Sequence, residues 1–165
     1  MSGSNVNPVL ALVSKADSLA NAFVSTHAQS IPITKSLEAL FSNQQGTPSE
    51  DEVERHLSAL RDSLNVMEQY VGEMMSMLYQ VDVFLSDPST TLRAGFNPKE
   101  ALGHVSELFH MYQAELLAKR ESLADLTCEE ISVHDFVENW SRMDEVQQGK
   151  KQEMDDLADL LAGFG

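Results

Sequence analysis

The chain has 165 residues, the length of a single domain, and its 26 acidic and 11 basic residues give a formal net charge of −15. This charge argues against nucleic-acid binding, because phosphate contacts need clustered Lys and Arg, and against docking on anionic lipid. One cysteine, Cys128, excludes an internal disulfide, and no apolar run approaches the roughly 20 residues that span a bilayer. Because Met1 to Pro8 also lack the features of a signal peptide, we expect a soluble, intracellular protein.

The N-terminal part predicts a helix that opens at Asn7, with Pro8 in the first helical position. Apolar residues then recur every three or four positions as far as Phe23, which gives the helix one apolar stripe. We expect Pro32 to interrupt this helix, because proline lacks the N–H donor and clashes with the preceding turn. A short helix follows, and residues 43–48 are typical of a polar linker.

The clearest predicted element is a long second helix that begins with a capping box at Ser49 and Glu52. Its apolar residues alternate in steps of four and three, the spacing of a left-handed coiled coil. At about 1.5 Å per residue the helix would be roughly 54 Å long, and Asp87-Pro88 would end it. Met75 and Tyr79 broaden the stripe, which favours packing against more than one helix. The heptad residues are Val53, Leu57, Leu60, Leu64, Met67, Val71, Met74, Leu78, Val81 and Leu85.

A third helix is predicted to begin at Asn97-Pro98, and Lys119 is the polar interruption in its apolar seam, which can set register or face an acidic partner. Residues 127–132 form a break, and Ser132 can cap a fourth helix. The acidic tail 154–161 either continues that helix or frays. The third seam holds Leu102, Val105, Phe109, Tyr112, Leu116, Leu123 and Leu126, and the fourth helix has an apolar face of Val133, Phe136, Val137, Trp140 and Met143.

Chemistry-bearing residues do not assemble into a catalytic pattern. Glu107 and His110 have the Glu-x-x-His spacing of di-iron bundles, but those sites need a second such motif, so we interpret this one as a solvated pair. Cys128 lies among acidic residues, which disfavour a reactive thiolate. We therefore expect no enzyme activity and no cofactor or metal, with a helical-bundle metal-carboxylate enzyme as an alternative that metal analysis would decide.

Two hypotheses account for Trp140, the only tryptophan of the chain. It can be a core anchor against the third helix, or an interface hot spot, since a desolvated tryptophan often dominates binding energy.

One stretch of the third helix is distinctive. Val105-Ser106, Leu108, Met111-Tyr112, Glu115-Leu116-Leu117, Lys119-Arg120 and Leu123 are followed by Trp140 and then by the acidic, leucine-bearing tail. This pattern resembles the cyclin-dependent kinase 2-interacting protein family over residues 102–143. The resemblance implies a non-enzymatic nuclear adaptor associated with replication and checkpoint kinases, and with an AAA-type ATPase assembly that acts on ribosome precursors and replisome components.

Together these patterns predict an all-α, elongated antiparallel coiled-coil or helical bundle of about four helices. We divide it into an N-terminal helical segment and linker (1–48), a long helical hairpin (49–126) and a C-terminal helix with an acidic tail (127–165). The expected partners are other proteins, with a kinase or an AAA ATPase complex as candidates, in a hetero-oligomer without nucleic acid or membrane. The expected location is the nucleus, with the cytoplasm as a second location. The alternative is a structural coiled-coil subunit of a kinetochore, tethering or cytoskeletal assembly.

Partner contact is predicted on one face of the third helix together with the tryptophan, and Lys119-Arg120 would select an acidic partner residue. Alanine at Tyr112, Leu116 or Trp140 is then expected to remove partner binding, with helical content largely kept for the Trp140 change. The predicted contact residues are Met111, Tyr112, Glu115, Leu116, Leu117, Lys119, Arg120 and Trp140.

Overall fold

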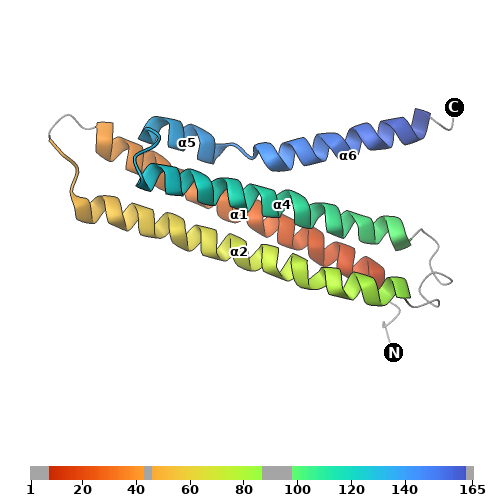
Figure 1. Cartoon of the computed structure of the whole chain (residues 1–165). Coiled ribbons are helices and arrows are strands. Elements are labelled where there is room, and N and C mark those ends of the chain that lie inside the picture. The colour runs from red at the N-terminus through yellow and green to blue at the C-terminus, as the bar shows by residue number, and fades with distance from the viewer. Residues whose placement is uncertain (1–7, 43–45, 87–97, 163–165) are drawn as a thin grey trace.

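The computed structural model describes residues 8–42, 46–86 and 98–162. These residues form α-helices and no strand, which confirms the predicted all-α bundle. The helices are α1 (Pro8–Ser42), α2 (Glu50–Ser86), α4 (Pro98–Thr127), α5 (Val133–Ser141) and α6 (Asp144–Ala162) (Figure 1). The predicted caps at Asn7 and Asn97 and the stop at Asp87-Pro88 lie outside the described residues.

Three long helices lie side by side and build the core of the molecule (Figure 1). α2 runs antiparallel to α1 and to α4, and it packs on both. α5 then reverses the chain and packs on α1 and α4, and α6 continues in the same direction along α4. The N-terminal segment thus shares its core with the predicted hairpin, while the division into three domains stays a prediction.

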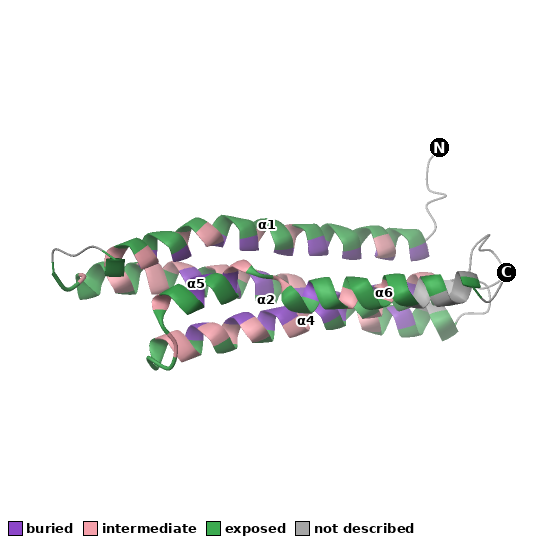
Figure 2. Ribbon diagram, turned by 90° about the horizontal axis from the view of Figure 1, so that it is seen from above, coloured by how far each residue is buried: buried purple, intermediate pink, exposed green. Residues whose placement is uncertain are grey.

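The heptad pattern of α2 marks its buried face correctly over most of its length. Leu60, Leu64, Met67, Val71, Met74 and Val81 are buried, and Leu57 is partly buried. Leu85 is 43% exposed, so the end of the predicted seam leaves the core. Buried residues face the space between the helices, whereas the outer faces are exposed (Figure 2). Such burial stabilises the bundle by about 25 cal/mol for each Å² of apolar surface removed from water.

The expectation that Pro32 interrupts the first helix is wrong, because α1 continues through it. An internal proline costs about 3 kcal/mol, partly through the hydrogen bond that its missing N–H cannot make. Pro32 is exposed, and so is Ala28 four residues earlier, whose carbonyl can therefore bond to water. Phe23 and Leu37 are both fully buried on either side of the proline, and their burial offsets the cost.

The C-terminal part contains two helices where the sequence predicted one helix and a tail. Ser132 caps α5 as predicted, since its hydroxyl accepts from the backbone N–H of Asp135 at 3.1 Å. The helix ends at Ser141, and Met143 lies in the short connection rather than on the face of α5. The tail belongs to a separate helix, α6, that packs on α4.

A glycine allows α6 to approach α4 closely. A Cβ atom at Gly149 would overlap the buried side chain of Met111 on α4, whereas a Cβ at Gly72 or Gly103 would meet nothing within 4 Å. Gly149 is therefore a contact position, and the other two glycines leave open space.

We expect Gly149→Ala to destabilise the docking of α6 by about 1–3 kcal/mol, because the added methyl group overpacks the contact with Met111. Gly72→Ala should instead raise the free energy of unfolding by about 0.5–1 kcal/mol, since alanine restricts the unfolded chain and meets no neighbour. Urea unfolding measures both changes, and hydrogen exchange locates the first in α6. Equal exchange of α6 amides in wild type and Gly149→Ala would contradict the prediction.

Candidate functional site

The predicted partner-contact residues are mostly inside the molecule. Six of the eight are buried by other parts of the same chain, with exposures of 0–7%: Met111, Tyr112, Glu115, Leu116, Lys119 and Trp140. Only Leu117, at 58% exposure, and the partly exposed Arg120 reach the surface. The expectation of one outward contact face therefore needs correction, because the seam of α4 and the ring of Trp140 are used to hold α1, α5 and α6.

The apolar members of this set join α4 to its neighbours. Tyr112 packs edge-on against Phe23 of α1, with ring centroids 4.9 Å apart, and Met111 packs where Gly149 of α6 approaches. An aromatic pair of this geometry contributes about 0.5–1.5 kcal/mol beyond the burial of its surface. These contacts orient α4 between α1 and α6.

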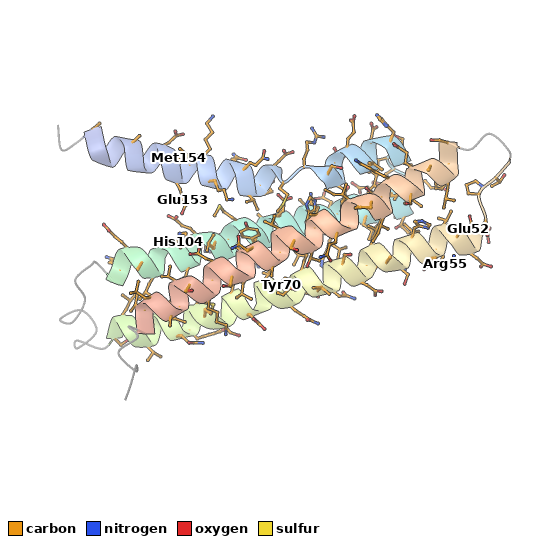
Figure 3. The ribbon with its side chains drawn as sticks, turned by 180° about the vertical axis from the view of Figure 1, so that it is seen from behind. Glu52, Arg55, Tyr70, His104, Glu153 and Met154 are labelled. Carbon is orange, nitrogen blue, oxygen red and sulfur yellow. The ribbon has the colours of Figure 1, made fainter. Side chains whose placement is uncertain are left out.

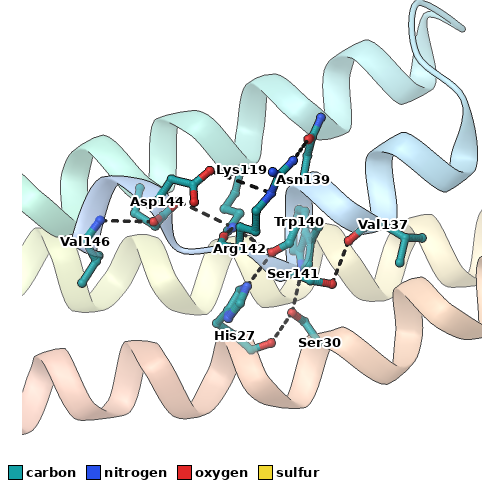
Figure 4. Close-up of polar contacts among 11 residues, drawn as sticks. His27, Ser30, Lys119, Val137, Asn139, Trp140, Ser141, Arg142, Asp144 and Val146 are labelled. Atoms are coloured by element: carbon teal, nitrogen blue, oxygen red, sulfur yellow. Dashed lines mark hydrogen bonds and ion pairs between the residues drawn. The ribbon is translucent and has the colours of Figure 1, made fainter. Parts of the chain in front are cut away.

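Glu115 and Lys119 form a buried pair on α4, which we call the clamp. Their charged atoms lie 3.5 Å apart, one helical turn from each other. The Lys119 ammonium donates to the carbonyl oxygens of Trp140, at 2.7 Å, and of Arg142, and so holds the connection between α5 and α6 (Figure 4). Glu115 accepts from the backbone N–H of Val146 at 3.4 Å, in the first turn of α6. The N–H groups in the first turn of a helix have no acceptor within the helix, so a carboxylate is stabilised beside them.

The clamp corrects the prediction that Lys119-Arg120 selects an acidic residue of a partner. Lys119 is 2% exposed and makes its polar contacts within the chain. Arg120 donates to the carboxylate of Glu68 on α2 at 2.8 Å, so its charge also has a partner inside the molecule. This exposed pair adds little stability, but it shows which turns of α2 and α4 lie side by side.

Of the two alternatives for Trp140, the structure has it as a core anchor and not as an exposed hot spot. Its contacts reach α1 as well as α4. Its indole N–H donates to the Ser30 hydroxyl at 2.8 Å, and Ser30 in turn donates to the carbonyl of His27 at 2.6 Å (Figure 4). The carbonyl of Trp140 lies 2.6 Å from Nε2 of His27. Since a carbonyl only accepts, Nε2 of His27 carries a proton and donates. The fully buried tryptophan is thus bonded at both its ring and its backbone.

Burial acts in opposite directions on the acid and the base of the clamp. It raises the pKa of Glu115, although the charge of Lys119 pulls that pKa down. It lowers the pKa of Lys119, although the charge of Glu115 pulls that pKa up. Each charge therefore depends on the other, and the hydrogen bonds to the carbonyls of Trp140 and Arg142 and from the N–H of Val146 compensate part of the remaining desolvation.

We expect acid to weaken the α1–α5 contact through His27. Burial lowers the pKa of His27 below 6.5, and the nearby charge of Lys119 lowers it further, although the bond to the Trp140 carbonyl opposes this. The unfolded chain then binds more protons than the folded chain just below pH 6.5, so stability falls as the pH drops, by at most about 1.4 kcal/mol per pH unit. His27→Gln should reduce that slope in urea unfolding measured between pH 5 and 7. An unchanged slope would contradict the assignment.

A second histidine, His104, links α1, α4 and α6. Nε2 of His104 lies 2.9 Å from a carboxylate oxygen of Asp17, and Nδ1 lies 3.6 Å from one of Glu153 (Figure 3). Burial alone would lower the pKa of His104, but the bond to Asp17 and the two negative charges raise it overall. Sequence reasoning missed this contact, because no local spacing connects residues 17, 104 and 153.

An apolar surface remains on the outer side of α2. Met75, Tyr79 and Val83 follow one another at four-residue spacing and are 47%, 72% and 68% exposed; we call them the exposed stripe. α2 packs on α1 and α4, while α5 and α6 lie on the other side of the bundle (Figure 1). The sequence signal was the breadth of the apolar face at Met75 and Tyr79, which we attributed to packing within the bundle.

Metal-binding groups and membrane-spanning helices were sought among the described residues. Glu107 and His110 are exposed on α4, and no group of three or more His, Cys, Asp or Glu in residues 8–42, 46–86 and 98–162 is arranged to hold a metal ion. Within the same ranges, none of the helices combines the length and the apolar character needed to cross a bilayer.

Comparison of the chain with protein-family models, with curated proteins and with solved structures found no match.

Proposed function

We propose that the chain is a non-enzymatic adaptor that binds a helix of another protein through the exposed stripe. The observation that carries this proposal is the run of Met75, Tyr79 and Val83 on a helix face that no other part of the described chain covers. Apolar side chains at four-residue spacing fit the apolar face of a second helix. An exposed tyrosine and methionine are also typical of protein interfaces.

The charges around the stripe indicate the kind of helix that would bind. Beside the stripe, α2 carries the acidic residues Glu73 and Asp82, and it has no Lys or Arg between residues 62 and 86. Two further acids of this segment, Asp62 and Glu68, lie before the stripe, and Glu68 is paired with Arg120. A partner helix with basic residues beside its apolar face would complement these charges, which speeds association and selects against acidic partners.

The resemblance to the cyclin-dependent kinase 2-interacting protein family supports the same function and adds a cellular setting. Under this proposal the adaptor acts in the nucleus within a hetero-oligomer that serves replication, checkpoint signalling or an AAA ATPase complex of ribosome biogenesis. Of the residues that carry the resemblance, from Val105 to Trp140, those after Met111 then build the α4–α5–α6 junction, and the partner binds on α2.

Affinity capture of the tagged chain followed by mass spectrometry tests the proposal. Tyr79→Glu combined with Val83→Glu should reduce the recovery of specific partners by about tenfold or more, because two charges would be buried in the interface. Asn65→Asp combined with Gln69→Glu adds the same charge at exposed positions of the same helix that lie before the stripe, and should leave recovery unchanged. Far-ultraviolet circular dichroism confirms that both variants fold.

The identity of the captured proteins distinguishes the two functional classes. Kinase or ATPase partners would support the adaptor, and rod-like subunits would favour a structural coiled-coil role. Full recovery with the stripe variant would contradict α2 as the contact face.

A further inference from the structure

An apolar pocket lies at the end of the bundle where α5 begins. It is formed where the end of α1, the start of α2, the end of α4 and the start of α5 meet. This end is opposite to the exposed stripe, which lies near the end of α2. The pocket is lined by the apolar residues Leu37, Phe41, Val53, Leu57, Leu126, Ile131 and Val133, with Thr127, Glu129 and Ser132 as its polar members.

The size and the walls of this end pocket suit a side chain. Its volume is about 310 Å³, which is at the small end of the range of roughly 300–1,000 Å³ found for small-molecule sites. Phe41 is 49% exposed at the pocket, whereas Leu37 is fully buried behind it. A pocket with a buried floor and an exposed aromatic wall can desolvate one bulky apolar group, as the centres of protein interfaces do.

The charge around the end pocket is mostly negative. Residues 46–54 and 125–138 contain neither Lys nor Arg, whereas the basic residues Lys35 and Arg55 lie two residues from the lining residues Leu37, Val53 and Leu57. The acidic residues of these two segments are Glu50, Asp51, Glu52, Glu54, Asp125, Glu129, Glu130, Asp135 and Glu138. Of these, Glu54 is paired with Arg61 and Glu138 with His134.

One of these acidic residues, Glu129, lines the pocket itself. α4 ends with the N–H of Glu130 donating to the carbonyl of Asp125 at 2.8 Å and that of Glu129 to Leu126 at 3.0 Å. Glu129 has φ of 60°, the left-handed conformation that glycine usually supplies at this position. A glutamate therefore stands where the backbone favours glycine, and it lines the pocket.

We propose that the end pocket binds a single bulky apolar side chain from a Lys- and Arg-rich segment of another protein. The apolar walls take the anchor side chain, and the surrounding carboxylates take the flanking basic residues. The negative field also repels acidic segments, including the acidic α6 of a second copy of this chain. This interaction is separate from the exposed stripe and survives if the stripe has no partner.

Selection from a phage-displayed library of random short peptides on the immobilised full chain tests the proposal. We expect recovered peptides to share one Leu, Ile, Met, Phe or Trp between Lys or Arg residues. Fluorescence anisotropy of a labelled selected peptide should show binding that weakens at high salt, and an alanine at the anchor position should weaken it by about tenfold or more.

Variants of the chain then locate the peptide. Val53→Trp fills the pocket and should weaken binding about tenfold or more, and Glu129→Gln with Glu130→Gln should weaken it less while the fold is kept. The matched control Glu73→Gln with Asp82→Asn removes two charges from α2 near the stripe and should bind as wild type. The stripe variant Tyr79→Glu with Val83→Glu should also bind normally, so failure of this proposal and failure of the adaptor proposal can be told apart.

Four results would overturn the proposal. They are the absence of any selected peptide, selection of acidic peptides, equal binding by Val53→Trp and wild type, and self-association in sedimentation velocity that Val53→Trp abolishes. The last result would assign the pocket to a second copy of the chain. If Val53→Trp does not fold, the variant Glu129→Gln with Glu130→Gln provides the test. Wild-type peptide binding by that variant would show that the carboxylates do not contribute, and would contradict the proposal.

Discussion

Lys119→Ala is expected to lower the free energy of unfolding by about 3–5 kcal/mol. The substitution leaves the buried carboxylate of Glu115 without its counter-charge, and it removes the donor to the carbonyls of Trp140 and Arg142. Taking away one member of a buried pair costs far more than losing a surface contact, because the other charge stays desolvated. Urea unfolding followed by circular dichroism measures the change.

Two further variants separate charge from packing at this position. Lys35→Ala removes an exposed lysine from α1 and should change stability by less than about 0.5 kcal/mol. Lys119→Met keeps the aliphatic stem, so it should cost less than alanine, and adding Glu115→Gln should restore part of the loss. A loss for Lys119→Ala as small as that for Lys35→Ala would show that the clamp does not hold the α5–α6 connection.

The cost of Lys119→Met should also rise with pH. The charge of Lys119 lowers the pKa of Glu115, which burial raises, so the methionine variant moves that pKa further up. Below its raised folded pKa the Glu115 carboxyl is neutral, and burying it costs little. Above that pKa the variant buries a carboxylate that has no counter-charge. As the pH rises from 4.5, the ordinary pKa of the carboxyl, to the raised folded pKa, the free energy of unfolding of the variant falls relative to wild type.

Trp140→Ala is expected to destabilise the protein by about 3–5 kcal/mol and to release α5 from α1. The ring is fully buried, its N–H bonds to Ser30, and it packs 5.5 Å from the ring of Phe136. Trp140→Phe keeps much of the apolar burial and loses the N–H bond, so it should cost less. Thermal unfolding and hydrogen exchange of α5 amides measure these effects.

The exposed Tyr79 is the matched aromatic control for Trp140. Tyr79→Ala should leave stability nearly unchanged, because the side chain is 72% exposed, while under the adaptor proposal it should reduce partner binding. This pattern reverses the expectation from sequence, in which Trp140→Ala lost binding and kept the helices. If Trp140→Ala keeps wild-type stability, the assignment of the tryptophan as the anchor of α5 is wrong.

Local spacing predicted the helices well where a single face is buried. The heptads of α2 and the seam of α4 identify core residues such as Leu64 and Val105, because residues three and four apart share one side of a helix. The cap at Ser132 was also predicted from the sequence, since a hydroxyl just before a helix accepts a hydrogen bond from a backbone N–H of its first turn. These signals depend only on neighbours within the same turn or two.

The candidate site was harder to read, because its residues have two possible uses. A helix face with Tyr112, Lys119 and a nearby Trp140 looks the same in sequence whether it binds another protein or its own chain. The seam of α4 accepts Lys119 only because two carbonyls and Glu115 converge on it from the α5–α6 connection and α4 itself. Pro32 is tolerated for a similar reason, since packing on both sides offsets the lost hydrogen bond.

The sequence alone determined that this protein is helical, acidic and built around a long amphipathic α2, because charge and apolar periodicity are properties of the chain itself. Tertiary structure decided which apolar residues are covered. It buried Trp140 and the clamp, left the exposed stripe and the end pocket open, and joined His104 to Asp17 and Glu153. The reason is physical: burial depends on which helices meet, and contacts between residues far apart in the chain leave no local pattern.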